Sequence, residues 1–296
     1  MARDSITWTV SGRQPCPCGS TKLYGDCHKG TDAWPISTAK PPITPSPTTG
    51  YAHPKCYMAS TYDCCDKISK EHWLSQAVLR QIGELTVIGL PQSRKSPVTV
   101  GLNSLAAKVL CSRHNAALSE LDTSAGYAFA NLNAALGHLL NPQQNRRLER
   151  NFLVDGFAIE LWSLKALLGA HHGGILAASG VPTRDALTFD MPAAVSTLTT
   201  GQFRSGTGLY YISQWNRSAA AAIATLSDQA KLVGGHFVLA QFSYHLAIDC
   251  PPEDPYTTKR LRPRAIRVHH EEFVSNIVFA WDEMRVGDHL IETNLP

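Results

Sequence analysis

The chain has 296 residues, of which 44% are hydrophobic and 8% aromatic, a composition that excludes a wholly disordered protein and allows more than one folding unit. Its formal net charge of +3 is small, so any affinity for nucleic acid must come from a local patch. Residues 1–15 lack the apolar core of a signal peptide, and no apolar run free of charges is long enough to cross a membrane. We therefore expect a cytoplasmic protein without a membrane partner.

The first feature along the chain is a cluster of metal-binding residue types within QPCPCGSTKLYGDCHKG. Cysteines in a reducing cytoplasm rarely form disulfides, and a cysteine cluster that includes a histidine indicates metal. The spacing Cys-x-Cys-x8-Cys-His suits a closed tetrahedral zinc site, and the expected ligands are Cys16, Cys18, Cys27 and His28. So small a module has almost no core, and its folding would depend on the metal, which contributes about 10–16 kcal/mol in zinc-finger peptides.

This cluster resembles the SEC-C motif, a short zinc module first recognised at the tail of the bacterial preprotein translocase motor. Thr21 replaces a usual glycine, and Gly25-Asp26 replaces a usually basic pair. The resemblance implies that residues 12–30 dock on another protein or on a ribonucleoprotein, while the alternative is a structural zinc cap without a partner. The Pro-, Thr- and Ser-rich residues 31–50 predict a linker that lets this module move. The matching positions are Cys16, Cys18, Gly19, Ser20, Lys22, Tyr24, Cys27 and His28.

A second cluster spans residues 51–125, where KCYMASTYDCCDKISKEHWLS is followed along the chain by NSLAAKVLCSRHNAALSELD. Two Cys/His groups flank a Glu-His dipeptide, and this order resembles an HNH endonuclease domain of the treble-clef, ββα-metal type. The resemblance implies a structural zinc site at Cys56, Cys64, Cys111 and His114. Cys65 and His53 are alternative ligands.

The same resemblance implies an active site composed of Glu71, His72, Asn103 and Asn115. An imidazole is partly neutral near pH 7, so His72 could act as the base that activates water, with its tautomer fixed by Asn103. Glu71 and Asn115 would offer oxygen ligands to Mg²⁺ or Mn²⁺. Glu71 replaces the commoner Asp, and the spacing Cys56-x7-Cys64 is wider than in a usual knuckle.

The Glu71-His72 dipeptide also has a plain structural interpretation. It could be a surface pair at the start of a helix capped by Ser69, and Asn103 could be an ordinary turn residue. A helical segment is predicted over residues 126–175, with two amphipathic helices separated at Asn141-Pro142. Charged residues among the apolar positions of the second helix are expected on its outer face: Asp155, Glu160 and Lys165. His171-His172 followed by glycine predicts the end of this helix.

Residues 181–296 have alternating and β-branched runs and predict a mostly antiparallel β region of unknown role. Within it, one basic run either contacts phosphates or marks an edge strand protected against aggregation. Cys250 is expected to be an inert thiol. The basic run comprises Lys259, Arg260, Arg262, Arg264 and Arg267.

The predicted fold class is α+β, with small zinc modules followed by a helical segment and a β region. The leading hypothesis is a metal-dependent HNH-type endonuclease that hydrolyses nucleic acid, DNA rather than RNA, with a SEC-C docking module. The company that HNH domains keep fits bacterial or phage-type host defence. The alternative is a non-catalytic, zinc-stabilised protein that binds protein or nucleic acid and retains an HNH-like scaffold.

Overall fold

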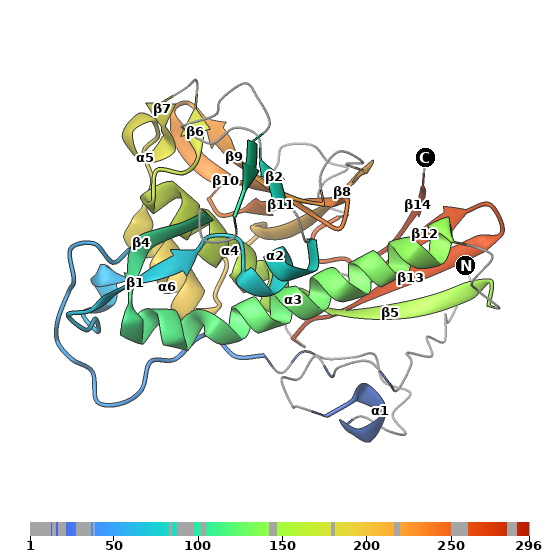
Figure 1. Ribbon diagram of the computed structural model, residues 1–296, viewed down its shortest axis with the longest axis horizontal. Coiled ribbons are helices and arrows are strands. Elements are labelled where there is room, and N and C mark those ends of the chain that lie inside the picture. Colours follow the sequence, from blue (N-terminus) through green and yellow to red (C-terminus); the bar gives the residue numbers. More distant parts are fainter. Residues whose placement is uncertain are drawn as a thin grey trace.

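The computed structural model describes residues 13, 16, 22–27, 37, 39–82, 85–87, 98–101, 105–141, 147–178, 181–215, 220–249, 260–282 and 289–295. These ranges contain both helices and mainly antiparallel strands, which agrees with the expected α+β class (Figure 1). None of the described helices combines the length and the apolar character needed to cross a membrane.

A two-stranded sheet followed by a long helix forms the N-terminal part of the body. Strand β1 (Ile68–His72) pairs antiparallel with β4 (Ala106–Cys111), and α3 (Ser112–Leu140) begins directly after β4. Glu71-His72 therefore lies in a strand, and the alternative interpretation as a helix start capped by Ser69 is wrong because pairing with β4 holds this segment extended. Smaller elements around it are η1 (Ala59–Thr61), α2 (Gln76–Ile82), β2 (Leu85–Val87) and β3 (Val98–Val100).

Helix α4 (Gly156–His172) lies at the centre of the fold and contacts α3, α6 and both larger sheets. It begins at Asp155, whose side chain caps the Ala158 amide, and ends at Gly173 as the sequence predicts. Every residue from Gly156 to His171 is buried, so the helix has no outer face. The expectation that Glu160 and Lys165 lie on an outer face is wrong: their exposed fractions are 0% and 2%.

Two four-stranded sheets make up most of the C-terminal region. The first has the order β8-β11-β10-β9 and is wholly antiparallel. The second has the order β14-β12-β13-β5, and its β12–β14 and β13–β5 pairs are parallel. The strand bounds are β5 (Glu149–Asp155), β8 (Gly208–Trp215), β9 (Ala221–Asp228), β10 (Lys231–Leu239), β11 (Phe242–Ala247), β12 (Ala265–His270), β13 (Phe273–Ala280) and β14 (Leu290–Asn294).

The basic run, for which the sequence allowed either phosphate contacts or an edge strand, is partly internal to a sheet. Strand β12 lies between β13 and β14, so the edge-strand prediction is wrong for this strand. Arg262 Nε lies 2.8 Å from Glu160 Oε1, and Arg267 pairs with Glu149. Both cations are therefore engaged in ion pairs, a buried one for Arg262 and a partly exposed one for Arg267. The remaining short elements are α1 (Tyr24–Cys27), β6 (Ala177–Ala178), β7 (Val181–Pro182), α5 (Thr183–Ala186) and α6 (Met191–Thr200).

Candidate metal centre

Four buried side chains converge where the β1–β4 sheet meets the first turn of α3. The Nδ1 atom of His114 lies 3.2 Å from the sulfur of Cys111, which ends β4 and caps α3. The same nitrogen lies 3.6 Å from the sulfur of Cys56 and 3.7 Å from that of Cys64. The ligand atoms of the four residues all lie within 4.8 Å of one another. The fold thus brings together the four residues that were expected for the second zinc site.

These four side chains can bind a metal ion only in certain protonation states. Burial raises the pKa of the thiols of Cys56 and Cys64, so without a positive charge nearby they would stay protonated. Burial lowers the pKa of His114, which keeps its imidazole in the neutral form that binds metal. Three sulfurs and one imidazole nitrogen could hold a metal ion and are compatible with a closed tetrahedral zinc site.

Thr61, at the end of η1, fixes the tautomer of His114. Its hydroxyl donates to the carbonyl of Met58 at 2.8 Å, so its lone pairs are left to face the imidazole. Nε2 of His114 lies 3.1 Å from this oxygen and must therefore carry the proton that it donates. The lone pair of Nδ1 then points at the three sulfurs, which is the arrangement that a metal ligand needs.

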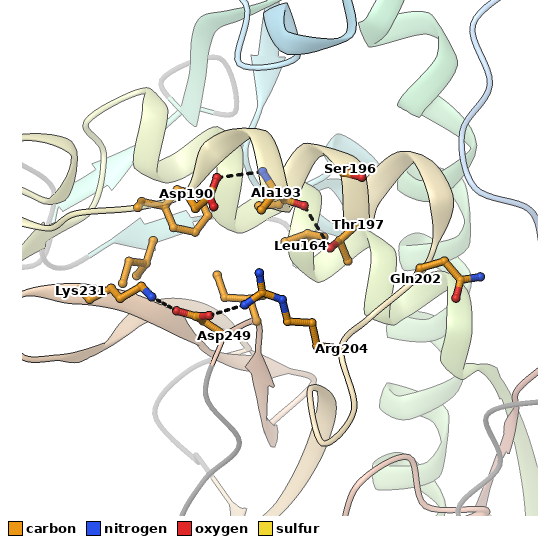
Figure 2. A pocket seen from close by; sticks show the side chains of 13 residues that line it. Leu164, Asp190, Ala193, Ser196, Thr197, Gln202, Arg204, Lys231 and Asp249 are labelled. Atoms are coloured by element: carbon orange, nitrogen blue, oxygen red, sulfur yellow. Dashed lines mark hydrogen bonds and ion pairs between the residues drawn. The ribbon is translucent and has the colours of Figure 1, made fainter.

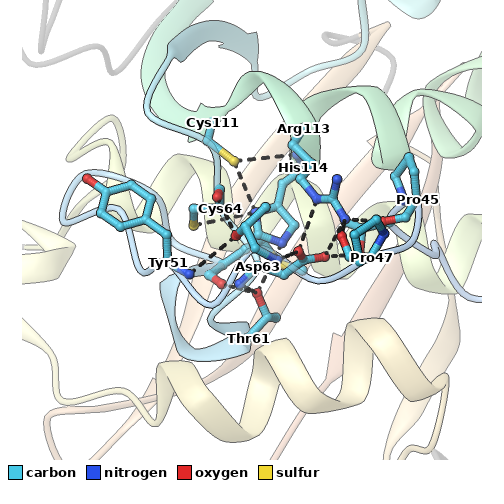
Figure 3. Close-up of polar contacts among 12 residues, drawn as sticks. Pro45, Pro47, Tyr51, Thr61, Asp63, Cys64, Cys111, Arg113 and His114 are labelled. Atoms are coloured by element: carbon cyan, nitrogen blue, oxygen red, sulfur yellow. Dashed lines mark hydrogen bonds and ion pairs between the residues drawn. The ribbon is translucent and has the colours of Figure 1, made fainter.

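Arg113 and Asp63 form a second layer around the centre (Figure 3). Arg113 Nε lies 3.1 Å from Asp63 Oδ1, and its Nη2 donates to the carbonyl of Pro47 at 2.9 Å. The Thr49 amide donates to Asp63 at 2.9 Å. Burial raises the pKa of Asp63, but hydrogen bonds from Thr44, Thr49 and Arg113 outweigh this and lower it overall. Residues 44–49 of the predicted linker are therefore bound to Asp63 and Arg113 beside the metal centre.

No protein-family model matches the chain, and no curated protein and no solved structure matches it. The buried Cys/His group alone identifies neither the SEC-C motif nor the HNH domain.

The other predicted metal ligands have different outcomes. Neither Cys65 nor His53 belongs to the four-residue group. In the N-terminal cluster, Cys16 is buried and Cys27 is half-buried, and the Cys16 amide donates to the carbonyl of Lys22 at 3.1 Å. Cys18 and His28 lie outside the described residues, which therefore contain only two of the four ligands predicted for the first zinc site.

The predicted catalytic residues differ in how deeply they are buried. His72 at the end of β1 and Asn115 in the first turn of α3 are half-buried, and Asn103 lies outside the described residues. Glu71 is only 5% exposed, and its Oε1 lies 2.5 Å from the ammonium nitrogen of Lys165. Its carboxylate thus faces α4 and is not presented in an open cleft.

Lys165 joins Glu71 to a second carboxylate that sequence reasoning missed. Its ammonium donates to Asp122 Oδ2 at 2.5 Å, so two carboxylates share one cation. Burial raises the pKa of Glu71, Lys165 opposes this rise, and Asp122 adds to it. The signal for Asp122 was its place on α3, seven residues and two turns beyond Asn115 on the same helix face. Lys165 had no comparable signal.

Proposed function

We propose that the protein is a zinc-stabilised nucleic-acid-binding protein on an HNH-like scaffold whose divalent-ion position is closed by Lys165. The observation that carries the proposal is the ammonium of Lys165, 2.5 Å from carboxylate oxygens of both Glu71 and Asp122. Two convergent carboxylates are the donors that a hard divalent ion would use. Here a side chain of the protein itself supplies the positive charge.

Exchange of this ammonium for Mg²⁺ or Mn²⁺ would be unfavourable. Mg²⁺ retains several waters, whereas the side chains of Glu71 and Lys165 are 6% and 2% exposed and leave little access for solvent. Displaced from its two carboxylates, the ammonium would be a buried, unpaired charge, which costs several kcal/mol. His72 would then have no adjacent metal ion to neutralise a leaving oxygen.

The metal in the buried Cys/His group is proposed to be structural zinc. Four protein ligands leave no open position for a substrate or water, which is the pattern of structural zinc sites. A second structural zinc at Cys16, Cys18, Cys27 and His28, and docking of that module on a partner protein, are proposed from the sequence pattern.

The test compares binding with cleavage on the same substrates. Purified zinc-loaded protein is incubated with supercoiled plasmid and with single-stranded RNA in the presence of Mg²⁺ or Mn²⁺, beside the His72→Ala variant at equal zinc content. We expect a mobility shift without strand cleavage in both proteins. Cleavage that requires the divalent ion and is lost in His72→Ala would overturn the closed-site proposal.

An HNH-type endonuclease acting on DNA, with a role in phage defence, is the second candidate. One observation favours it: β1 pairs with β4, and β4 ends at the metal centre and leads into α3, so the half-buried His72 and Asn115 lie on adjoining elements. Catalysis at this site would require Lys165 to leave Glu71 before an ion could bind. The cleavage test above separates the two candidates, since only the nuclease gives nicked plasmid.

A further inference from the structure

A hollow of about 540 Å³ lies between the metal centre and the C-terminal end of α4. Three exposed cations line it, and each comes from a different part of the fold. Lys55 directly precedes the metal-binding Cys56, Lys108 lies on β4, and Arg184 lies on α5. None of the described residues that line the hollow carries a carboxylate. The contacts of α4 with both β4 and α5 bring these elements to one side of the molecule (Figure 1).

The two lysines of this hollow are not neutralised within the described part of the protein. Neither Lys55 nor Lys108 forms an ion pair with a carboxylate of any described residue. A second hollow, of about 340 Å³ between α6 and the β10–β11 hairpin, is different (Figure 2). There Asp249 accepts from Arg204 at 2.9 Å and also pairs with Lys231. The first hollow therefore has an unbalanced positive charge, and the second does not.

Arg184 is held in place over the end of α4. Its Nη1 donates to the carbonyl of His172 at 3.5 Å, and so it opposes the negative end of the helix dipole. Gly174, at φ +65°, leaves room for it, because a Cβ there would lie 3.0 Å from the guanidinium carbon. The neighbouring Asp185 is 3.7 Å away, and both side chains are more than half exposed, so this pair is weak. The guanidinium thus remains able to bind an anion.

We infer that this hollow binds the phosphate backbone of a nucleic acid through Lys55, Lys108 and Arg184. The inference rests on the proposed nucleic-acid binding and assigns it a site. Three cations on separate elements suit successive phosphates of one strand better than a single isolated anion. Arg184 offers a planar fork to phosphate oxygens, and the two ammonium groups act as point charges. Contacts of this kind position a strand without reading its sequence.

The experiment measures binding as a function of salt. Fluorescence anisotropy follows labelled duplex DNA, single-stranded DNA and RNA of one mixed sequence, with full-length zinc-loaded protein. The test variant is Lys55→Ala/Lys108→Ala/Arg184→Ala. The matched control, Lys67→Ala/Arg80→Ala/Arg147→Ala, removes the same charge from exposed positions outside the hollow. Zinc content and circular dichroism establish that both variants are folded.

For the test variant we expect the slope of log affinity against log salt to become shallower by about three units, roughly one per lost phosphate contact. The control should keep the wild-type slope within about half a unit. Equal weakening of the two triple variants would attribute binding to net charge and overturn the site alone. A wild-type protein that binds none of the nucleic acids would overturn the proposed function and this site together. Binding of a phosphoserine peptide instead would assign the hollow to protein recognition and overturn the inference.

Discussion

The hydroxyl oxygen of Thr61 lies 3.1 Å from Nε2 of His114, on the side of the imidazole opposite Nδ1, the nitrogen that faces the three cysteine sulfurs. Because this contact fixes which nitrogen is free to bind metal, it should affect metal affinity without supplying a ligand. Thr61→Val keeps the shape of the side chain and removes the acceptor. We expect its zinc affinity to fall by roughly 10–100-fold. Competition with a chromogenic chelator measures the change.

Thr61→Ser is the matched control for this substitution. It keeps the hydroxyl that accepts from His114, so its affinity should stay close to that of the wild type. Equal affinities for Thr61→Val and Thr61→Ser would show that the Thr61 contact does not tune the metal.

The two adjacent cysteines Cys64 and Cys65 allow a sharp test of the ligand set. Cys64 belongs to the buried four-residue group and Cys65 does not. Cys64→Ser should therefore lose one zinc ion per chain and unfold at lower urea concentration, because a structural metal contributes directly to folding. Cys65→Ser should retain the wild-type zinc content. Mass spectrometry of the metal after dialysis measures both, and loss of zinc from Cys65→Ser alone would contradict the assignment.

Replacing Lys165 should destabilise the protein strongly. Lys165→Met leaves Glu71 buried and without its cation, and breaking a buried ion pair in this way costs about 3–5 kcal/mol. The double variant Lys165→Met/Glu71→Gln should recover part of the loss, because the remaining partner, Asp122, has a side chain that is 25% exposed and can be hydrated. Urea unfolding at neutral pH in excess zinc gives both values. A Lys165→Met variant as stable as the wild type would argue against a buried charge cluster.

His171 should make stability depend on pH in the acidic range. Burial, followed by the charges of His172 and Arg184, lowers its pKa to about 4. An unfolded histidine has a pKa of about 6.5, so between these values the unfolded chain binds a proton that the folded protein does not. Stability contributed by His171 is therefore present above about pH 6.5 and is lost as the pH falls toward 4.

The measurement compares wild type with His171→Gln by urea unfolding from pH 7.5 down to 4.5. The variant lacks the titrating group, although it also loses the contact between His171 Nδ1 and Thr183 Oγ1 at 3.1 Å. It should be less stable near neutral pH. The slope of its stability against pH should also be smaller, because its unfolding near pH 5 takes up about one proton fewer. An identical slope in the two proteins would show that His171 does not carry this effect.

The meeting of the four buried Cys and His side chains was predictable from the HNH resemblance, which names cysteine and histidine positions that must lie close together. The spacing of Cys56, Cys64, Cys111 and His114 therefore restricts the fold around them. The two long helices were also predictable in outline from apolar periodicity. Helix α3, however, begins well before the expected segment, at Ser112.

The charge cluster beside the centre was not predictable in the same way. A single lysine in an apolar helix usually lies at the surface. Only the packing of β1 and α3 against this helix shows that Lys165 forms ion pairs with two carboxylates, those of Glu71 and Asp122. Arg262 is a similar case, since its partner Glu160 lies far from it in the chain. Long-range pairs of this kind depend on tertiary packing, which cannot be predicted from the residues next to each partner in the sequence.

The pairing of β5 with β13 has a consequence for how the chain is made. Asn151 on β5 and Asn276 on β13 are hydrogen-bonded neighbours, although 125 residues separate them along the chain. On the ribosome, β5 emerges long before β13, so the backbone groups of its pairing edge have no partner until β13 has been made. A nascent or truncated chain that stops before residue 273 would expose this strand edge, and chaperone dependence should be greatest during that interval.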